Sequence, residues 1–225
     1  MKKILVILTG GTIGSKNDNT SINTDKASAY NLINLYYNKY GSEDLFEVIQ
    51  PLNILSENMN LNYLSVFCEA ISDVDMNMYK GIIITHGSDT LSYTSALTGM
   101  IYNSTDIPIV ITASNYTLTD KRSNGLDNFR SCVTFINNTE TAGIFVIYQD
   151  NNKINNIYIS TRLKEADPYS DQFSAFGNGL YGYINENKIT VNNPDFAGKN
   201  QNKISFENPL MFQNDILLIR PYPGL

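Results

Sequence analysis

The sequence has little of the chemistry on which many enzymes rely, since it contains one histidine, two cysteines and no tryptophan among 225 residues. The histidine, His86, lies two residues from Ser88, and this spacing gives no orienting geometry for a Ser–His–Asp triad. Two cysteines and one histidine are too few for a zinc site, so we expect no metal. Cys68 and Cys132 lie among apolar residues, which is typical of buried thiols in a reducing compartment, although a disulfide stays open.

Positive charge and long hydrophobic runs are also scarce. The 16 basic and 22 acidic residues give a formal charge of −6, which disfavours nucleic acid or an anionic membrane as a partner but leaves a local basic patch open. No segment approaches the ~18 apolar residues that span a membrane. The run Ile4–Leu8 is too short for a secretion signal. We therefore expect a cytoplasmic protein.

What the sequence does contain is an alternation of short β-branched runs with longer amphipathic segments. Apolar residues make up 42% of the chain, enough to bury a core. Continuous apolar runs are typical of strands buried on both faces of a parallel sheet. They cover Lys3–Thr9, Gly81–Thr85, Pro108–Thr112 and Gly143–Tyr148, with weaker candidates at Phe46–Gln50 and Asn156–Ser160.

Apolar residues at helical spacing fill the gaps between these runs, at 25–40, 61–71, 90–102 and 126–136. This alternation predicts an α/β fold, a doubly wound and mostly parallel sheet flanked by helices.

Changes in composition divide the chain into three parts. We expect an N-terminal α/β domain over 1–185, a polar linker over 186–210, and over 211–225 the start of a smaller α/β domain. A strand followed by a turn should lead further, so the end of the sequence predicts a second domain that is truncated or missing.

Hydroxyl and carboxylate groups recur directly after the predicted strands. Parallel sheets bind ligands beyond the carboxyl ends of their strands. Polar residues of this kind follow four predicted strands, in the segments 10–12, 56–58, 86–90 and 113–115. Each polar residue there could also cap a helix or fill a turn, but their recurrence at four strand ends favours a site.

The glycine-rich turn at 10–14 is a weak phosphate signal, because it lacks both the P-loop and the dinucleotide pattern. A hydrolase without histidine needs another base, and a lysine with a lowered pKa can serve. Lys164 follows the last predicted strand. Taken alone, a surface lysine is the commoner interpretation.

Three segments of the chain stand out together, and they read ILTGGTIGS, ITHGSDTLSYTSALTG and PIVITASNYTLTDKRSNGLDNF. Together they resemble the bacterial-type L-asparaginase family, which are amidohydrolases with two catalytic threonines. The H-G-[ST]-D-T motif is quite specific, and T-G-G-T-I is specific when it follows an N-terminal strand. The similarity runs from the first residue to Lys164, and LLIRPYPG looks like the family's entry into its second domain. The R-S-N-G-x-x-N-F segment and the lack of a signal peptide look closer to the cytoplasmic type I branch.

The resemblance implies catalytic roles for four residues. Thr12 aligns with the nucleophilic threonine, and Ser88 takes the place of the second threonine while keeping its hydroxyl. Ser88, Asp89 and Lys164 look like the family's hydroxyl–carboxylate–lysine constellation. The substrate-binding positions implied are Ser56, Glu57, Gly11, Gly87 and Ala113, the last through its carbonyl.

The activity implied is hydrolysis of L-asparagine to L-aspartate and ammonia through a threonine acyl-enzyme, without a cofactor. Glutamine is a close rival as substrate, and a homodimer or homotetramer is implied. Alternatives are a non-catalytic relative that binds a small amino acid, a component of a transfer-RNA-dependent amidotransferase, and a flavodoxin-like nucleotide-binding module. One departure concerns the family's lid tyrosine, because 15–24 contains no tyrosine and Tyr30 is the first.

Overall fold

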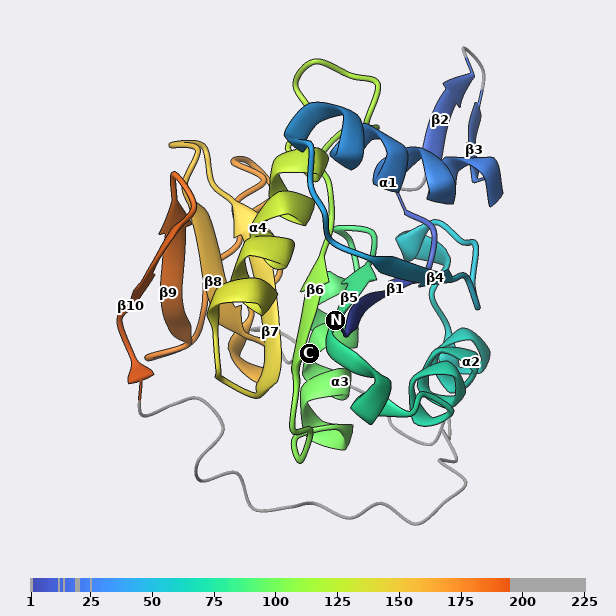
Figure 1. Cartoon of the computed structure of the whole chain (residues 1–225). Coiled ribbons are helices and arrows are strands. Elements are labelled where there is room, and N and C mark those ends of the chain that lie inside the picture. Colours follow the sequence, from blue (N-terminus) through green and yellow to red (C-terminus); the bar gives the residue numbers. More distant parts are fainter. Residues whose placement is uncertain (1, 12, 14, 19–20, 25, 195–225) are drawn as a thin grey trace, which may run out of the picture.

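An eight-stranded sheet with helices on both faces forms the centre of the molecule (Figure 1). The computed structural model describes residues 2–11, 13, 15–18, 21–24 and 26–194. The strand order is β10-β9-β8-β7-β6-β5-β1-β4. The strands are β1 (Lys3–Leu8), β4 (Phe46–Ile49), β5 (Tyr79–Thr85), β6 (Pro108–Thr112), β7 (Gly143–Gln149), β8 (Asn155–Ile159), β9 (Leu180–Asn185) and β10 (Lys188–Val191).

Five neighbouring strands, β4, β1, β5, β6 and β7, run parallel. β1 lies between β4 and β5, so the chain first winds toward one edge and then toward the other. Sheets of this kind bind ligands where the winding direction reverses, here beyond the carboxyl ends of β1 and β5, and we call this place the crevice. The predicted doubly wound, mostly parallel α/β sheet is confirmed.

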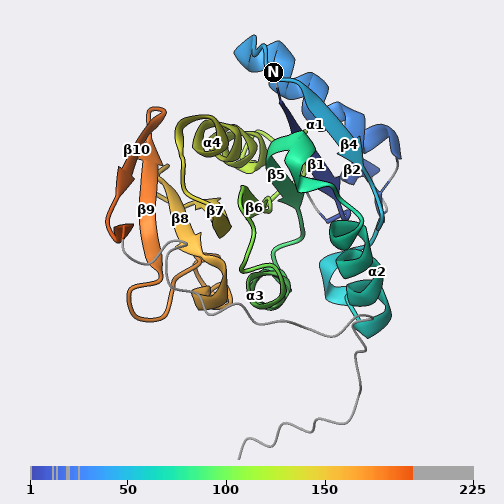
Figure 2. The same cartoon turned by 60° about the horizontal axis from the view of Figure 1, so that its bottom comes forward.

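Two helices cover each face of the sheet. α1 (Lys26–Tyr40) and α4 (Gly125–Asn138) lie on one face, and α2 (Leu61–Ser72) and α3 (Leu91–Ile101) lie on the other (Figure 2). Ile4 and Val6 pack with Phe129 of α4, whereas Leu5 and Ile7 pack with the α2 side. Successive strand residues point to opposite faces, so a sheet covered on both sides needs continuous apolar runs.

The end of the sheet differs from the sequence-based expectation. β9 was not predicted, and β10 lies where an irregular linker was expected, so that expectation is wrong for Lys188–Val191. A two-residue turn joins these strands, with Glu186 and Asn187 both at left-handed φ of 47° and 66°, the conformation that tight hairpins require. Residues 195–225 lie outside the described residues, so the predicted second domain stays a prediction.

The polar segment after the glycine-rich turn forms a hairpin, in which β2 (Ser15–Asp18) pairs antiparallel with β3 (Ser21–Thr24). Cys68 and Cys132 are buried and free, so the structure contains no disulfide between them. Within the part of the chain that the structure describes, no helix has the length and apolar character needed to cross a membrane.

Candidate active site

The carboxyl ends of β1 and β5 are joined by hydrogen bonds. Thr9 donates to the Thr85 carbonyl through both its N–H (3.2 Å) and its Oγ1 (2.9 Å). Ile54, in the loop after β4, donates its N–H to the Thr9 carbonyl (3.1 Å) and accepts from the Gly11 N–H (2.8 Å). Three chain segments therefore meet at this edge of the sheet.

Two glycines allow this close approach. Gly10 and Gly11 have φ of +103° and +69°, where a side chain is strained. A Cβ on Gly10 would lie 2.5 Å from the Ile54 nitrogen, and one on Gly11 would lie 2.7 Å from the Gly87 nitrogen. The glycines thus serve backbone packing and let Gly11 lie against Gly87; the substrate-binding role of both stays a prediction. Thr12 lies outside the described residues, so its role stays a prediction.

Ser56 and Asp89 are brought together from loops that are distant in sequence. The Ser56 hydroxyl donates to Asp89 Oδ2 over 2.5 Å, a short charge-assisted hydrogen bond. Thr90 Oγ1 donates to the Ser56 carbonyl (3.0 Å) and fixes the backbone. A serine hydroxyl has a single proton, so in this arrangement Ser56 orients Asp89, and its remaining lone pairs can only accept.

Helix capping does not account for these residues. The N-cap position of α3 belongs to Thr90, and that of the 3-10 helix η2 (Ser56–Asn58) to Leu55, without a side-chain capping bond at either. Asp89 instead accepts from Ser56 across the crevice. The alternative interpretation of Ser56, Ser88 and Asp89 as N-caps is therefore wrong.

His86 is a structural residue at the end of β5. It is completely buried, donates its N–H to the Thr112 carbonyl (2.8 Å), and its Nδ1 lies 2.9 Å from the Gly87 carbonyl. Burial lowers the pKa of the imidazole, which favours the neutral ring. No hydrogen bond links His86 to Ser88 among the described residues, in line with the sequence-based argument against a triad.

Asn128 holds the Ala113 carbonyl at the end of β6. Its Nδ2 donates to that carbonyl (2.9 Å) and its Oδ1 accepts from the Gln149 N–H (2.8 Å). A carbonyl has two lone pairs, so Ala113 keeps one for another donor. Sequence reasoning gave Asn128 no role, although it is the second asparagine of the R-S-N-G-x-x-N-F segment, because a motif alone does not show a contact with a strand end.

The chain before Lys164 takes a different route from the one that the sequence suggested. β8 runs antiparallel to β7 and ends at the amino edge of the sheet, where Ile159 pairs with Phe145. The chain then turns through η4 (Ser160–Arg162), which packs on α3. It returns beside the first turn of α3, where Tyr93 donates a hydrogen bond to Glu165.

The side chain of Lys164 is not paired with Asp89. Its Nζ lies over the Phe176 ring, 4.6 Å from the centroid, and no ion pair among the described residues joins it to Asp89. Ser88 is half-buried, and Glu57 is exposed beside Ser56. The convergence of Lys164 and Ser88 on one amide stays a prediction.

A polar cavity of about 370 Å³ lies at the carboxyl ends of β6 and β7. Its wall includes Asn115, Asn124, Tyr148, Gln149 and Asp171. Asn115 belongs to the strand-end segment 113–115, and Asn115 and Asn124 both lie in one of the segments that resemble the family. No motif marks Gln149 or Asp171, and none of the five was given a role from sequence. Burial and the nearby charge of Asp89 raise the pKa of the Asp171 carboxyl.

Metal ligands do not gather in the part of the chain that the structure describes, where no group of three or more His, Cys, Asp or Glu could hold a metal ion. The arrangement at the crevice can instead supply an oriented carboxylate, hydroxyl groups and backbone donors. These groups suit recognition of a small zwitterion.

Known sequences share most of the length of this chain. The family model described as "Asparaginase, N-terminal" matches residues 3–196. The L-asparaginase of Thermococcus kodakarensis is 27% identical over 226 residues, which are 99% of this chain and 65% of that protein. One of the subunits of the glutamyl-tRNA(Gln) amidotransferase of Methanosphaera stadtmanae is 28% identical over 179 residues, 77% of this chain and 40% of that protein.

Solved structures share the fold. The thermostable L-asparaginase from Thermococcus kodakarensis superposes with a TM-score of 0.72 at 27% identity, covering 84% of this chain and 56% of that one. A probable cytoplasmic L-asparaginase from Campylobacter jejuni gives 0.69 at 23% identity, covering 86% and 57%. The chain spans 65% and 40% of the lengths of the two curated relatives. Since the family model matches most of its length, the chain belongs to the asparaginase family.

Proposed function

We propose that the protein hydrolyses the side-chain amide of L-asparagine to L-aspartate and ammonia. The hydrogen bond between Ser56 and Asp89, beside the contact of Gly11 with Gly87, supports this proposal most directly. It orients a carboxylate in the crevice where the fold binds ligands. The α-ammonium of asparagine binds Asp89, and Glu57 adds a second negative charge nearby.

The reaction proceeds through an ester on Thr12. Its Oγ attacks the amide carbon, the C–N bond breaks, and the amide nitrogen leaves as ammonia after gaining a proton. Water then attacks the ester carbon, aspartate leaves, and the hydroxyl of Thr12 regains its proton. Lys164 accepts and returns protons through Ser88. Backbone N–H groups near Gly11 stabilise the oxyanion, an interaction worth about 3 kcal/mol per donor.

The test is release of ammonia and aspartate from L-asparagine by the wild-type protein and by Thr12→Ala. We expect equimolar products from the wild type and at least a roughly 10³-fold lower kcat in the variant, because the nucleophile is lost. Thr190→Ala, on β10 far from the crevice, serves as the matched control and keeps wild-type kinetics. Binding of asparagine without ammonia release would instead identify a non-catalytic binder.

Glutamine is the comparison substrate. A pocket distinguishes one methylene by only about 1–3 kcal/mol, so we expect measurable but slower ammonia release from it. A higher kcat/KM for glutamine than for asparagine would make the protein a glutaminase.

The amidotransferase relatives support a second candidate, in which the same amide chemistry supplies a larger amidotransferase. Purification from the native cell separates the two candidates. A cytoplasmic homo-oligomer active on free asparagine fits the first candidate, and stable copurification with other polypeptides fits the second.

A further inference from the structure

Asn128 on α4 fills the gap where β6 and β7 separate. The paired register of these two strands ends at Ile111 and Val146. Beyond that pair, the completely buried side chain of Asn128 donates to the Ala113 carbonyl on the β6 side and accepts from the Gln149 N–H on the β7 side. A side-chain amide carries the same kinds of donor and acceptor as a peptide unit, so Asn128 continues the hydrogen bonding between the strands.

The direction of the Asn128 amide is fixed by its two partners. Its oxygen faces an N–H and its nitrogen faces a carbonyl, so the reversed amide would place like groups together. A second buried amide ties α4 to the sheet, because Asn155 donates to Ser131 Oγ (2.6 Å) and to the Asp127 carbonyl (3.2 Å). Asn128 therefore holds the Ala113 carbonyl from a helix that is itself fixed to the sheet.

The Ala113 carbonyl depends on Asn128 for its position. Ala113 is completely buried and directly follows β6. In the part of the chain that the structure describes, no backbone N–H donates to its carbonyl, and the donor is the side chain of Asn128. Two residues further along, Asn115 exchanges hydrogen bonds of 3.0 Å each with Asn124, the N-cap residue of α4. Asparagines of α4 and of its N-cap thus hold both ends of the segment 113–115.

The carbonyl held in this way lies beside the crevice. The His86 N–H donates to the Thr112 carbonyl (2.8 Å), so the chain after β6 runs beside the chain after β5. The neighbour of His86 is Gly87, where an added Cβ would lie 2.5 Å from the Ser56 Cβ. Ala113 therefore lies close to the segment that contacts Ser56, and its carbonyl has one lone pair left for a ligand.

We propose that Asn128 is a positioning residue, which aims the Ala113 carbonyl at the amide nitrogen of the substrate. The carbonyl accepts a hydrogen bond from that nitrogen while Thr12 attacks the amide carbon. An ester of the same acid has an oxygen in place of the nitrogen and has no N–H to donate. Asn128 therefore makes the protein favour amides over esters. This inference rests on the proposed hydrolysis of asparagine.

The experiment compares L-asparagine with the β-methyl ester of L-aspartate, measured for both as release of L-aspartate. Asn128→Ser shortens the side chain, so that it no longer bridges the Ala113 carbonyl and the Gln149 N–H. We expect kcat/KM for asparagine to fall about tenfold or more, because the contact with the amide is misplaced. The kcat/KM for the ester should stay within about threefold of wild type.

Asn155→Ser is the matched control, because it breaks buried hydrogen bonds between α4 and β8 without touching Ala113. Both variants should lower the Tm, but the control should leave the ratio of the two kcat/KM values at its wild-type level. If Asn128→Ser does not fold, Asn128→Asp takes its place. This variant is closer in shape to the wild type and, when ionised, also lacks the donor to Ala113.

An equal loss for the amide and the ester, or no loss for the amide, overturns the positioning role and leaves Asn128 as a structural residue. If the wild type cleaves neither substrate, the proposed hydrolysis fails by itself. Calorimetric binding of asparagine and of the ester to wild type and variant then tests Asn128. A loss of affinity for asparagine alone supports the positioning role, and equal losses, or no binding of either compound, overturn it.

Discussion

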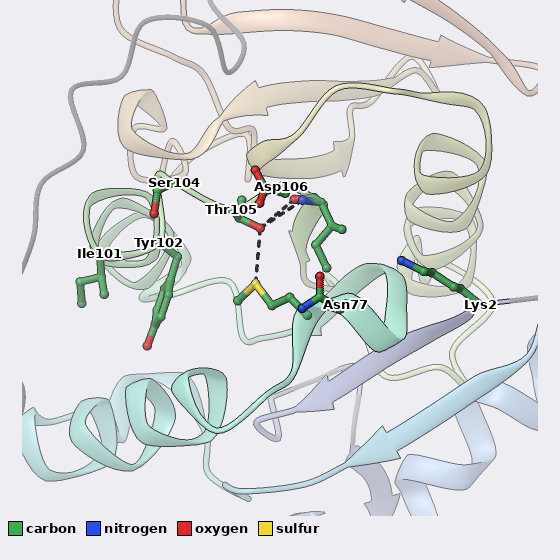
Figure 3. A pocket seen from close by; sticks show the side chains of 9 residues that line it. Lys2, Asn77, Ile101, Tyr102, Ser104, Thr105 and Asp106 are labelled. Atoms are coloured by element: carbon green, nitrogen blue, oxygen red, sulfur yellow. Dashed lines mark hydrogen bonds between the residues drawn. The ribbon is translucent and has the colours of Figure 1, made fainter.

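Two cavities of nearly the same volume but of different chemistry lie at opposite ends of the parallel strands. We call the side where these strands begin the amino edge and the side where they end the carboxyl edge. The amino edge holds one of about 360 Å³ between the starts of β1, β5 and β6, shown in Figure 3. There Thr105 Oγ1 donates to the Ile107 carbonyl (3.1 Å), and the Tyr102 hydroxyl donates to the Cys68 carbonyl (2.7 Å). At the carboxyl edge, buried oxygens of Tyr148 and Gln149 have no partner among the described residues.

This difference shows that cavity volume does not mark the site in this molecule. The hydroxyls at the amino edge donate their protons to the protein itself, so they stabilise the fold. The carboxyl edge keeps hydrogen-bonding capacity and charge for a ligand, at a cost in stability. Variants of the carboxyl edge should therefore change catalysis, whereas variants of the amino edge should change stability.

The largest effect is expected from Gly87→Ala. The new Cβ would lie 2.5 Å from the Ser56 Cβ and closer still to its hydroxyl, so Ser56 must move and release Asp89. Misplacement of a site group by about 1 Å can cost 10²-fold, and we expect kcat/KM for asparagine to fall by about that factor in a steady-state assay. Gly41→Ala, where nothing lies within 4 Å but φ is +60°, controls for backbone strain away from the crevice, and it should lower stability without lowering kcat/KM. Activity of Gly87→Ala within twofold of wild type would contradict the geometry.

Ser56→Ala removes the hydrogen bond to Asp89 without moving the backbone. A hydrogen bond to a charged group is worth about 1.5–3 kcal/mol, so we expect kcat/KM to fall roughly 10- to 100-fold. Thr105→Val is the counterpart at the amino edge, where loss of the hydroxyl should lower the free energy of unfolding by about 1 kcal/mol and leave the kinetics unchanged. Loss of activity in Thr105→Val would contradict the assignment of a purely structural role to the amino edge.

The smallest effect concerns the pH dependence of stability, through His86 at the carboxyl edge. Its pKa is lowered from 6.5 by burial, so below pH 6.5 the unfolded chain binds a proton that the native protein does not. The contribution of His86 is fully present above that pH and is lost as the pH falls. The Tm should drop between pH 7.5 and 5.5, and drop less in His86→Gln. Equal drops in the two proteins would show that His86 is not involved.

The sequence was sufficient for the elements that repeat a local pattern. The continuous apolar runs at 3–9 and 143–148 predicted β1 and β7, because a strand buried on both faces can contain little else. The polar groups after the strands predict a site at the carboxyl ends of the parallel strands, because parallel strands end together, and this location stays a prediction. The strand β9 was not predicted, because the alternation of apolar and polar residues in a short antiparallel strand resembles the pattern of a surface loop.

The contacts that give the site its chemistry depended on the tertiary structure. Local patterns predicted that Asp89 follows β5. Only the tertiary structure brings Ser56 to Asp89. The tertiary structure also reverses the chain after β8, so that the segment of Lys164 returns toward α3. Asp171 and Tyr148 belong to no motif, yet both line one cavity of the folded protein. Periodicity reports which face of an element is buried, whereas the meeting of side chains from distant loops is set by packing between elements, which no local pattern encodes.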